Sequence, residues 1–190
     1  ENEISDVFKD FNFKKINSSK KMIEKRFIDA ISDGIKETMI KFDDLIIMGQ
    51  DIAEYGGVFK ITEGFVELFG KERVRNTPIC ESSIIEIAMG LSICNRKSIV
   101  ELQFSDFITS GFNPVVNYLA KVHYRWGQNA DVVLRMPCGA GVGAGPFHSQ
   151  TNEAWFTKTP GLVVVYPAFP EDAKGLLISS IENPNPVLFF

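Results

Sequence analysis

Three side chains suited to chemistry stand far apart in the sequence, each near the end of a predicted strand or in a loop. Glu81 follows the segment 77–80 at a passage from strand to helix, Phe107 follows the third apolar strand, and His148 follows a glycine-rich stretch. Singly, each has an ordinary explanation: a carboxylate favours a helix N-terminus, and a lone loop histidine serves local hydrogen bonding. A carboxylate, an aromatic ring and an imidazole at one end of a sheet, however, form the kind of set that holds a cofactor.

The glycine-rich stretch, residues 139–145, reads GAGVGAG and has the composition of a phosphate-binding loop. No Gly-Lys-Ser/Thr follows it, which argues against a Walker-type nucleotide site. A proline-containing segment also stands where a dinucleotide-binding fold would begin a helix. We therefore interpret the stretch as a tightly turned or flexible loop, and a Rossmann-like nucleotide binder is a disfavoured alternative.

Composition limits the class of protein. The 190 residues are 45% hydrophobic, enough for one domain with a buried core, and they carry a net charge of −4. No basic stripe is present, which argues against a nucleic-acid partner. The longest apolar runs have the length of strands, so we expect no membrane partner. Because no secretory signal opens the sequence, we expect a cytoplasmic protein.

Disulfide and metal frameworks are also disfavoured. The three cysteines, Cys80, Cys94 and Cys138, are odd in number and widely spaced, which is typical of reduced thiols. His123 and His148 are the two histidines of the sequence, so a histidine-based metal cluster is excluded.

Helical and strand patterns alternate along the chain. Apolar residues at four-residue spacing predict a first helix, capped by Ser18 or Ser19, with a face of Ile23, Phe27, Ile31, Ile35 and Met39. Further helices are expected at 62–69, at 81–93, over a long stretch 106–126 with Pro114 in a first turn or at a kink, and from Pro170 onward. Apolar runs predict strands at 45–48, 73–76, 98–102, 131–136, 162–166 and 187–190.

Strands that are apolar throughout and alternate with helices indicate a parallel sheet covered on both faces. The predicted fold is a three-layer α/β/α domain with a mainly parallel sheet of about six strands. Ligands of such sheets bind beyond the carboxyl ends of the strands, where Glu81, Phe107 and His148 are expected to meet. We interpret residues 1–21 as a linker or docking arm and 22–190 as the domain. The apolar segment 186–190 lacks a cap or polar tail, which predicts that the sequence is cut there.

Short sequence blocks, in their order and spacing, support a more specific interpretation. They are GQDIA at 49–53, GGVF at 56–59, FGKERV at 69–74, NTPICE at 76–81, ELQFSDF at 101–107, HSQ at 148–150, PGL at 160–162 and DAKGLL at 172–177. Together they resemble the beta part of the thiamine-diphosphate-dependent decarboxylating component of 2-oxo acid dehydrogenases. The resemblance implies a transketolase-like pyrimidine-binding domain, cut before the family's C-terminal domain, from a chain in which alpha and beta parts are fused.

The resemblance also implies a role for each candidate residue. Glu81 matches the glutamate that hydrogen-bonds a pyrimidine nitrogen of thiamine diphosphate, and Phe107 matches the aromatic residue that stacks on that ring. Ile79 and Gln103 match neighbouring positions of the pocket wall. His148 matches the histidine that faces the thiazolium and the substrate. The implied catalytic residues are therefore Glu81 and His148.

Many members of this family hold a potassium ion through main-chain carbonyls. The matching positions here are Val132, Val133, Ser180, Ile181, Asn183 and Asn185. The family usually has aspartate where this chain has Asn183. Asparagine is tolerable if main-chain oxygens hold the ion, and it lowers the affinity if carboxylate charge does.

One motif of the superfamily is missing: the sequence contains no Gly-Asp-Gly that is followed by an asparagine further along the chain. That motif holds magnesium and the cofactor's diphosphate. The resemblance therefore implies that an alpha part, separate or fused upstream, holds both, and that this chain alone is catalytically incomplete. A lipoyl acyltransferase component is the second implied partner.

The implied reaction is oxidative decarboxylation of a 2-oxo acid with acyl transfer to lipoyl groups. The pattern YRWGQNA at 124–130 favours a branched-chain 2-oxo acid, with pyruvate as the second choice. A non-catalytic dimerisation or regulatory module is the alternative, and the presence of Glu81, Phe107 and His148 together disfavours it.

Apolar residues between 112 and 126 cover more than one face of a helix, so a single stripe facing the sheet cannot bury them all. Exposed apolar area of this kind marks an interface, which predicts a twofold homodimer. A helix buried wholly within one domain is the alternative.

Overall fold

The sheet has six parallel strands, whose carboxyl ends lie along one edge. In the computed structural model, which describes residues 3–12 and 23–190, the strands follow the order β2-β1-β3-β4-β6-β5, and every neighbouring pair is parallel. Their bounds are β1 Ile46–Gly49, β2 Val74–Asn76, β3 Ser98–Glu101, β4 Val132–Arg135, β5 Val163–Val165 and β6 Val187–Phe189. The predicted fold class is confirmed, and each strand ends within one residue of its expected bounds.

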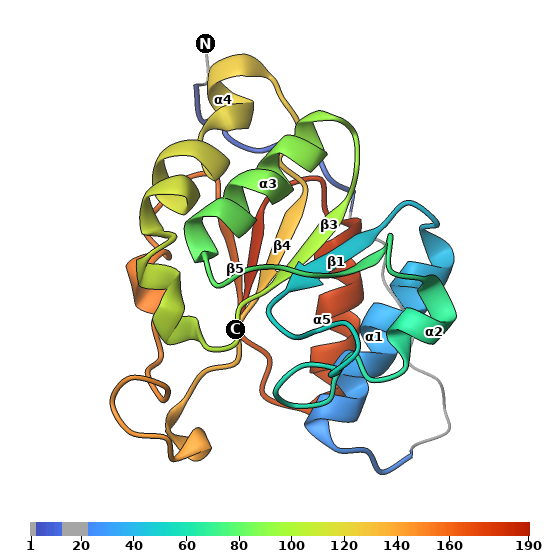
Figure 1. The fold of residues 1–190 in the computed structure, drawn as a ribbon. Helices are drawn as coiled ribbons and strands as arrows, with labels where there is room; N and C mark the ends of the chain where they lie inside the picture. Colours follow the sequence, from blue (N-terminus) through green and yellow to red (C-terminus); the bar gives the residue numbers. More distant parts are fainter. Residues whose placement is uncertain (1–2, 13–22) are drawn as a thin grey trace.

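Helices cover both faces of the sheet and complete three layers (Figure 1). The helices α1 Phe27–Lys41 and α5 Pro170–Glu182 pack against each other on one face, above a core that includes Ile35 and Leu177. The helix α3 Glu81–Ile93 covers the other face, where Ile85 and Leu119 belong to a second core. Within the described residues, no helix combines the length and the apolarity needed to cross a membrane.

The prediction of one long helix over 106–126 is wrong, because the stretch divides into three short segments. These are the 3-10 turn η2 Ser105–Thr109, the π-helix η3 Pro114–Leu119 and the helix α4 Val122–Trp126. Pro114 does stand in a first turn, that of η3. Two close approaches explain the breaks: a Cβ on Gly111 would overlap Ile85 of α3, and a Cβ on Gly161 would overlap the Ala120 carbonyl. A regular helix with ordinary side chains could not pack so closely at these two points.

Other helical segments are short and lie in the connections. They are the helix α2 Phe65–Phe69 and the 3-10 turns η1 Glu3–Asp6, η4 Ala140–Val142 and η5 Glu153–Trp155. The helices expected over 81–93 and from Pro170 onward begin at the predicted residues.

Helix α1 starts at Phe27, later than expected. Arg26 is its extended N-cap residue, with ψ 152°, and the Arg26 guanidinium donates to the Asp29 carboxylate at 2.7 and 2.8 Å. This pair stabilises a start at Phe27. Ile23 was expected on the helix but lies before it and is 64% exposed. Both serines expected to cap the helix lie outside the described residues.

At the carboxyl edge, a buried ion pair joins β3 to β4. Arg135 Nη2 lies 2.7 Å from Glu101 Oε2, with side chains 6% and 5% exposed, and the two residues are register partners. Strand β1 comes close to this pair, since a Cβ on Gly49 would lie 2.5 Å from the Glu101 carbonyl oxygen. Three loops start at this point, after Gly49, Glu101 and Arg135.

The first described residues pack at the opposite, amino edge of the sheet. Lys9 N donates to Asn185 Oδ1 at 2.7 Å, and Asn185 Nδ2 donates to Lys9 O at 2.9 Å. Asn185 is buried, so this pair of bonds ties residues 3–12 to the connection between α5 and β6. The interpretation of the first residues as a docking arm stays a prediction.

We expect Gly161→Ala to destabilise the domain by about 2 kcal/mol or more. Gly161 has a φ of +92°, and its Cβ would overlap the Ala120 carbonyl. Gly175→Ala is the matched control: a Cβ at Gly175, inside α5, would meet nothing within 4 Å. The control should be neutral or stabilise by up to about 1 kcal/mol. Urea unfolding measures both, and a wild-type midpoint for Gly161→Ala would contradict the close approach.

Candidate functional site

Glu81 is the first residue of α3 and lies buried at the carboxyl edge of the sheet, 9% exposed. Its two oxygens have separate donors. Gln50 Nε2 donates to Oε1 at 3.1 Å, and Ser110 Oγ lies 3.2 Å from Oε2. Gln50 follows β1 and Ser110 follows η2, so two loops from the same edge hold the carboxylate. A buried carboxylate with donors on both oxygens is fixed in orientation.

Ser110 connects Glu81 to Phe107. The same Ser110 hydroxyl lies 2.9 Å from the Phe107 carbonyl oxygen, three residues earlier in the chain. Phe107 is half-buried. The Ser110 hydroxyl therefore links the buried carboxylate to the main chain of the residue that carries this partly accessible aromatic ring.

The ring of His148 packs against an aromatic cluster that includes Phe107. The ring centroids of His148 and Phe107 lie 5.3 Å apart, and those of His148 and Phe104 lie 4.9 Å apart, both in edge-to-face geometry. Phe104 also makes an edge contact with Phe107 at 5.9 Å and another with Phe59 at 5.9 Å. These geometries suit the ring quadrupoles and hold the imidazole at the rim of an apolar wall.

The loop that carries His148 is anchored at its base. Gly139 N donates to Gln150 O at 3.1 Å, and the buried Asp106 carboxylate accepts the Gln150 side-chain amide at 2.8 Å. Within the loop, Gly139, Gly143 and Gly145 have positive φ angles of 105°, 66° and 77°. The glycines therefore allow tight turns, which agrees with the turned-loop interpretation of this stretch.

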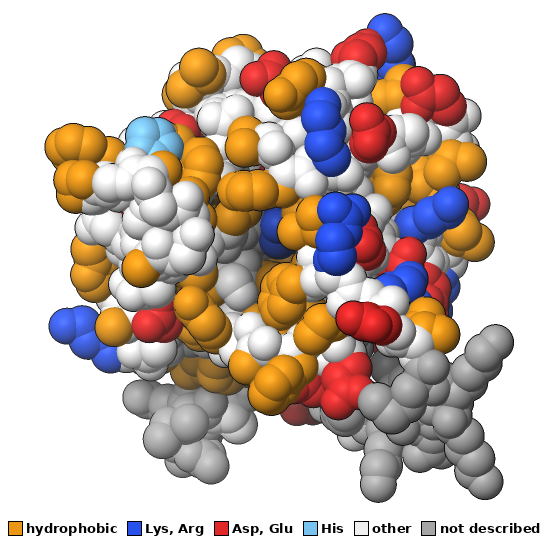
Figure 2. Space-filling view, turned by 90° about the horizontal axis from the view of Figure 1, so that it is seen from below, with side chains coloured by type: hydrophobic (Ala, Val, Ile, Leu, Met, Phe, Trp, Pro, Cys, Tyr) orange, Lys and Arg blue, Asp and Glu red, His pale blue; other side chains and the backbone are white. Residues whose placement is uncertain are grey.

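The structure thus gathers the three principal candidates at one edge, with Phe107 and His148 in contact and Glu81 joined to Phe107 through Ser110. The two wall candidates are less enclosed. Ile79 is 82% exposed, just before α3, and Gln103 is half-buried on the loop after β3. Their roles stay predictions. Figure 2 looks at the molecule from below and shows hydrophobic side chains gathered over much of this face.

Three residues of the site escaped the sequence analysis: Gln50, Phe104 and Ser110. Each lies inside or next to a block that was recognised, yet each is neutral and acts only through contacts formed by the fold. A weak signal existed for Ser110, because a hydroxyl three residues after Phe107 can reach back to that residue's carbonyl in a helical turn.

The cysteines are all free, as expected for reduced thiols. Cys80 is exposed beside Glu81, and hydrogen bonding to Ser83 lowers the pKa of its thiol, against the opposing charge of Glu81. Burial raises the pKa of Cys138, and the hydrogen bond to Cys138, together with burial, raises the pKa of Tyr166 to about 12.

A mainly apolar pocket of about 250 Å³ lies next to this cluster. It shares Phe59 with the aromatic cluster and also touches Arg135, Met136 and Phe189, at the ends of β4 and β6. Glu81, Phe107 and His148 are not among its lining residues, so this pocket adjoins the aromatic cluster at Phe59 and does not reach the carboxylate.

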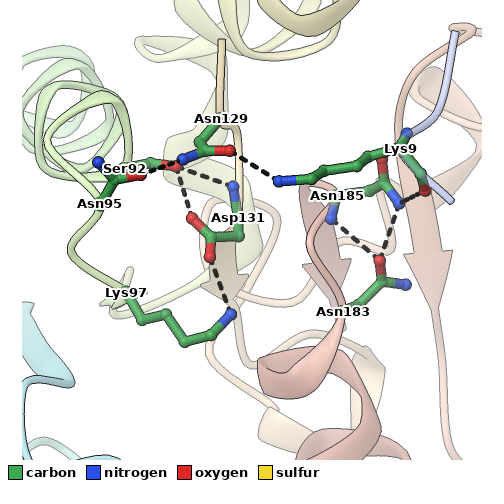
Figure 3. A network of polar contacts seen from close by, with 8 residues as sticks. All are labelled: Lys9, Ser92, Asn95, Lys97, Asn129, Asp131, Asn183 and Asn185. Atoms are coloured by element: carbon green, nitrogen blue, oxygen red, sulfur yellow. Dashed lines mark hydrogen bonds and ion pairs between the residues drawn. The ribbon is translucent and has the colours of Figure 1, made fainter. Parts of the chain in front are cut away.

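The positions matched to a potassium site lie near the amino ends of β4 and β6, and Figure 3 shows two of them, Asn183 and Asn185. Val132 and Val133 begin β4, which is paired on both sides, and Ser180 and Ile181 lie in the last turn of α5. The side-chain oxygens of Asn183 and Asn185 already accept hydrogen bonds from protein donors.

Asn183 Oδ1 accepts both the main-chain N–H and the side-chain amide of Asn185 at 3.0 Å. Asn185 Oδ1 accepts Lys9 N, and Lys9 Nζ reaches on to Asn129 Oδ1 at 2.9 Å. Across residues 3–12 and 23–190, no group of three or more His, Cys, Asp or Glu side chains is placed to hold a metal ion.

Comparison with known families assigns the class of the domain. Residues 24–190 match the transketolase pyrimidine-binding domain, and this match covers most of the chain. The chain therefore belongs to the transketolase pyrimidine-binding domain family. A solved structure described as a split-gene transketolase, an inactive beta4 tetramer, is similar in fold with a TM-score of 0.69 at 17% identity, over 86% of this chain and 49% of that one.

Individual relatives narrow the class. The chain is 42% identical over 166 residues to the 2-oxoisovalerate dehydrogenase subunit beta of Bacillus subtilis, which covers 86% of this chain and 51% of the relative. It is 46% identical over 147 residues to the mitochondrial 2-oxoisovalerate dehydrogenase subunit beta 2 of Arabidopsis thaliana, covering 76% and 41%. It is 38% identical over 170 residues to the pyruvate dehydrogenase E1 component subunit beta of Staphylococcus epidermidis, covering 88% and 52%. The chain spans about half the length of these relatives.

Proposed function

We propose that this chain is the pyrimidine-binding beta part of a thiamine-diphosphate-dependent 2-oxo acid dehydrogenase. The observation that carries the proposal is the buried Glu81 carboxylate, joined through Ser110 to Phe107, whose ring contacts His148. A branched-chain 2-oxo acid is the first choice of substrate, because the 2-oxoisovalerate relatives are 42% and 46% identical. Pyruvate is the second choice of substrate, because the pyruvate dehydrogenase relative is 38% identical.

The residues of the site fit the aminopyrimidine of this cofactor. Phe107 offers an aromatic ring for stacking, and Glu81 offers a carboxyl group that can share a proton with a ring nitrogen. When bound with its pyrimidine held by Phe107 and Glu81, thiamine diphosphate would supply an acidic thiazolium carbon suited to adding a 2-oxo group and taking up the electron pair released with carbon dioxide. His148, at the rim of the aromatic wall, would face that reacting end and steady charge there.

The cofactor's other end needs another polypeptide segment. The 190 residues contain no Gly-Asp-Gly motif, so magnesium and the diphosphate would be held by an alpha part, separate or fused. A lipoyl acyltransferase component would accept the acyl group. The alpha part would also make most of the contacts with the substrate's side chain, since Glu81 and Phe107 are suited to the cofactor ring.

Glu81→Gln should lower turnover of the complete enzyme by a factor of about 100 or more, because an amide cannot relay the proton. The matched control is Glu86→Gln, on the same helix but solvent-exposed, which should keep the wild-type rate. Both variants are assayed with saturating cofactor and 2-oxo acid. Turnover of Glu81→Gln within threefold of the control, about 0.7 kcal/mol, would refute the proposed role.

Residues 1–190 alone should bind thiamine diphosphate weakly and show no decarboxylation, since they supply one half of the site. Calorimetric titration with magnesium and the cofactor measures this directly, first with the chain alone and then after addition of its alpha part. Submicromolar affinity of the isolated chain would contradict the half-site proposal.

Self-association is proposed through the segment 112–126. Val115, Leu119 and Val122 are buried there, while Tyr124 and Trp126 are 50% and 63% exposed. The outward aromatic side chains favour an interface over burial within one domain. A twofold homodimer is the simplest assembly that would cover them.

Trp126→Asp should therefore shift the protein toward smaller species in sedimentation experiments. Leu68→Asp, an equally exposed apolar position on α2, is the control that should leave the assembly unchanged. Identical sedimentation of wild type and Trp126→Asp, over a range of concentrations, would argue against this interface.

Potassium is proposed to bind main-chain oxygens at the end of α5. Proline at position 184 has no N–H, and Asn185 N donates to Asn183 Oδ1, so the Ser180 and Ile181 carbonyls lack the usual donor four residues on. Such carbonyls at a helix C-terminus attract a cation. Replacing potassium with the larger tetramethylammonium ion should lower the melting temperature by a few degrees, about 1 kcal/mol. An unchanged melting temperature in both salts would contradict this site.

A further inference from the structure

The two oxygens of the Glu81 carboxylate have different neighbours. Oε1 accepts the Gln50 amide at 3.1 Å, and Oε2 lies 3.2 Å from the Ser110 hydroxyl. Gln50 is 4% exposed, so water does not compete for its amide. An amide NH₂ only donates, whereas a hydroxyl both donates one hydrogen and accepts. Oε1 therefore has a fixed donor, and Oε2 has an adaptable one.

The Ser110 hydroxyl has one hydrogen, and two oxygens of the protein lie within its reach. These are Glu81 Oε2 at 3.2 Å and the Phe107 carbonyl oxygen at 2.9 Å. When Oε2 is ionised, the hydrogen is drawn to it, because bonds to a charged oxygen are the stronger ones. When Oε2 carries a proton, the hydrogen turns to the Phe107 carbonyl. The direction of the hydroxyl thus follows the protonation of Oε2.

We propose that Gln50 and Ser110 are positioning residues for the reaction proposed above. Gln50 confines the exchangeable proton of Glu81 to Oε2, and Ser110 turns from the Phe107 carbonyl to Oε2 as that proton leaves. This inference rests on the proposed function. The O–H bond at Oε2 breaks, an N–H bond forms at the pyrimidine nitrogen, and the Ser110 hydrogen bond then stabilises the negative charge left on Oε2.

The surroundings of Glu81 favour this division of roles. Gln50 from the loop after β1 and Ser110 from the end of η2 are both neutral. Cys80, the N-cap residue just before Glu81, is an ionisable neighbour whose thiol lies near enough for the charge of Glu81 to act on it. Cys80 bonds to Ser83 rather than to the carboxylate, so the side chains that hydrogen-bond the Glu81 oxygens are the neutral Gln50 and Ser110.

The first test is Ser110→Ala in the complete enzyme with its alpha part. Loss of a hydrogen bond to a developing charge should lower kcat by about 10- to 100-fold, with KM for cofactor and substrate changed by less than about threefold. Ser110→Thr keeps the hydroxyl and should recover most of the rate. The matched control is Thr109→Val: the Thr109 hydroxyl also bonds a carbonyl three residues back, Asp106 O at 3.1 Å, but touches no carboxylate. It should keep the wild-type kcat.

The second test is Gln50→Glu, which replaces a fixed donor with a second carboxyl group 3.1 Å from Oε1. Two carboxyl groups at that distance share a proton to higher pH, so the carboxyl midpoint of the kcat–pH profile should rise by about one pH unit or more. A purely structural role for Gln50 would change the melting temperature and leave this midpoint in place.

Glu81→Gln, measured in the same assay, distinguishes a failure of the positioning roles from a failure of the proposed function. An inactive Glu81→Gln, with wild-type kcat for Ser110→Ala and an unmoved midpoint for Gln50→Glu, overturns the positioning roles and leaves the proposed function standing. A fully active Glu81→Gln overturns the proposed function itself. Lower kcat for Ser110→Ala, recovery by Ser110→Thr and a raised midpoint for Gln50→Glu support the inference.

Discussion

The buried ion pair between Glu101 and Arg135 is the interaction on which the site depends. Its side chains are 5% and 6% exposed, so loss of either partner would leave an uncompensated charge in the interior. It lies where β3 and β4 end, and Gly49 at the end of β1 packs against it. The loops that carry Gln50, Phe107 and His148 all start from these three strand ends. Because the ion pair holds the ends of β3 and β4 together next to the end of β1, it sets the spacing between the side chains that the three loops carry.

Most of the fold could be predicted from the sequence because parallel strands buried on both faces leave a clear pattern. Each strand was found within one residue of its apolar run, and α3 begins at Glu81, where the strand-to-helix passage placed it. The failures have tertiary causes. The stretch 106–126 is broken where Gly111 meets Ile85 and where Gly161 meets Ala120, and no local pattern records contacts between distant segments.

The site was predictable to the extent that its residues are chemically distinctive. Glu81 and His148 stand out as ionisable groups near strand ends, and the family blocks single out Phe107. Gln50 and Ser110 do not stand out, because a neutral amide and a hydroxyl acquire a role only when the fold brings them to a carboxylate. Ile79 illustrates the converse: its block is recognisable, yet its side chain is 82% exposed, as expected of a wall completed by a ligand or a partner.

The most direct test of the central claim is a crystal structure of the complete protein, with its alpha part and bound thiamine diphosphate. The expected result is a pyrimidine nitrogen within about 3 Å of Glu81 Oε2, with the Phe107 ring stacked on the pyrimidine and His148 facing the thiazolium. A pyrimidine bound away from Glu81, with the carboxylate still held by Gln50 and Ser110 alone, would contradict the assignment of this domain as the pyrimidine half of the site.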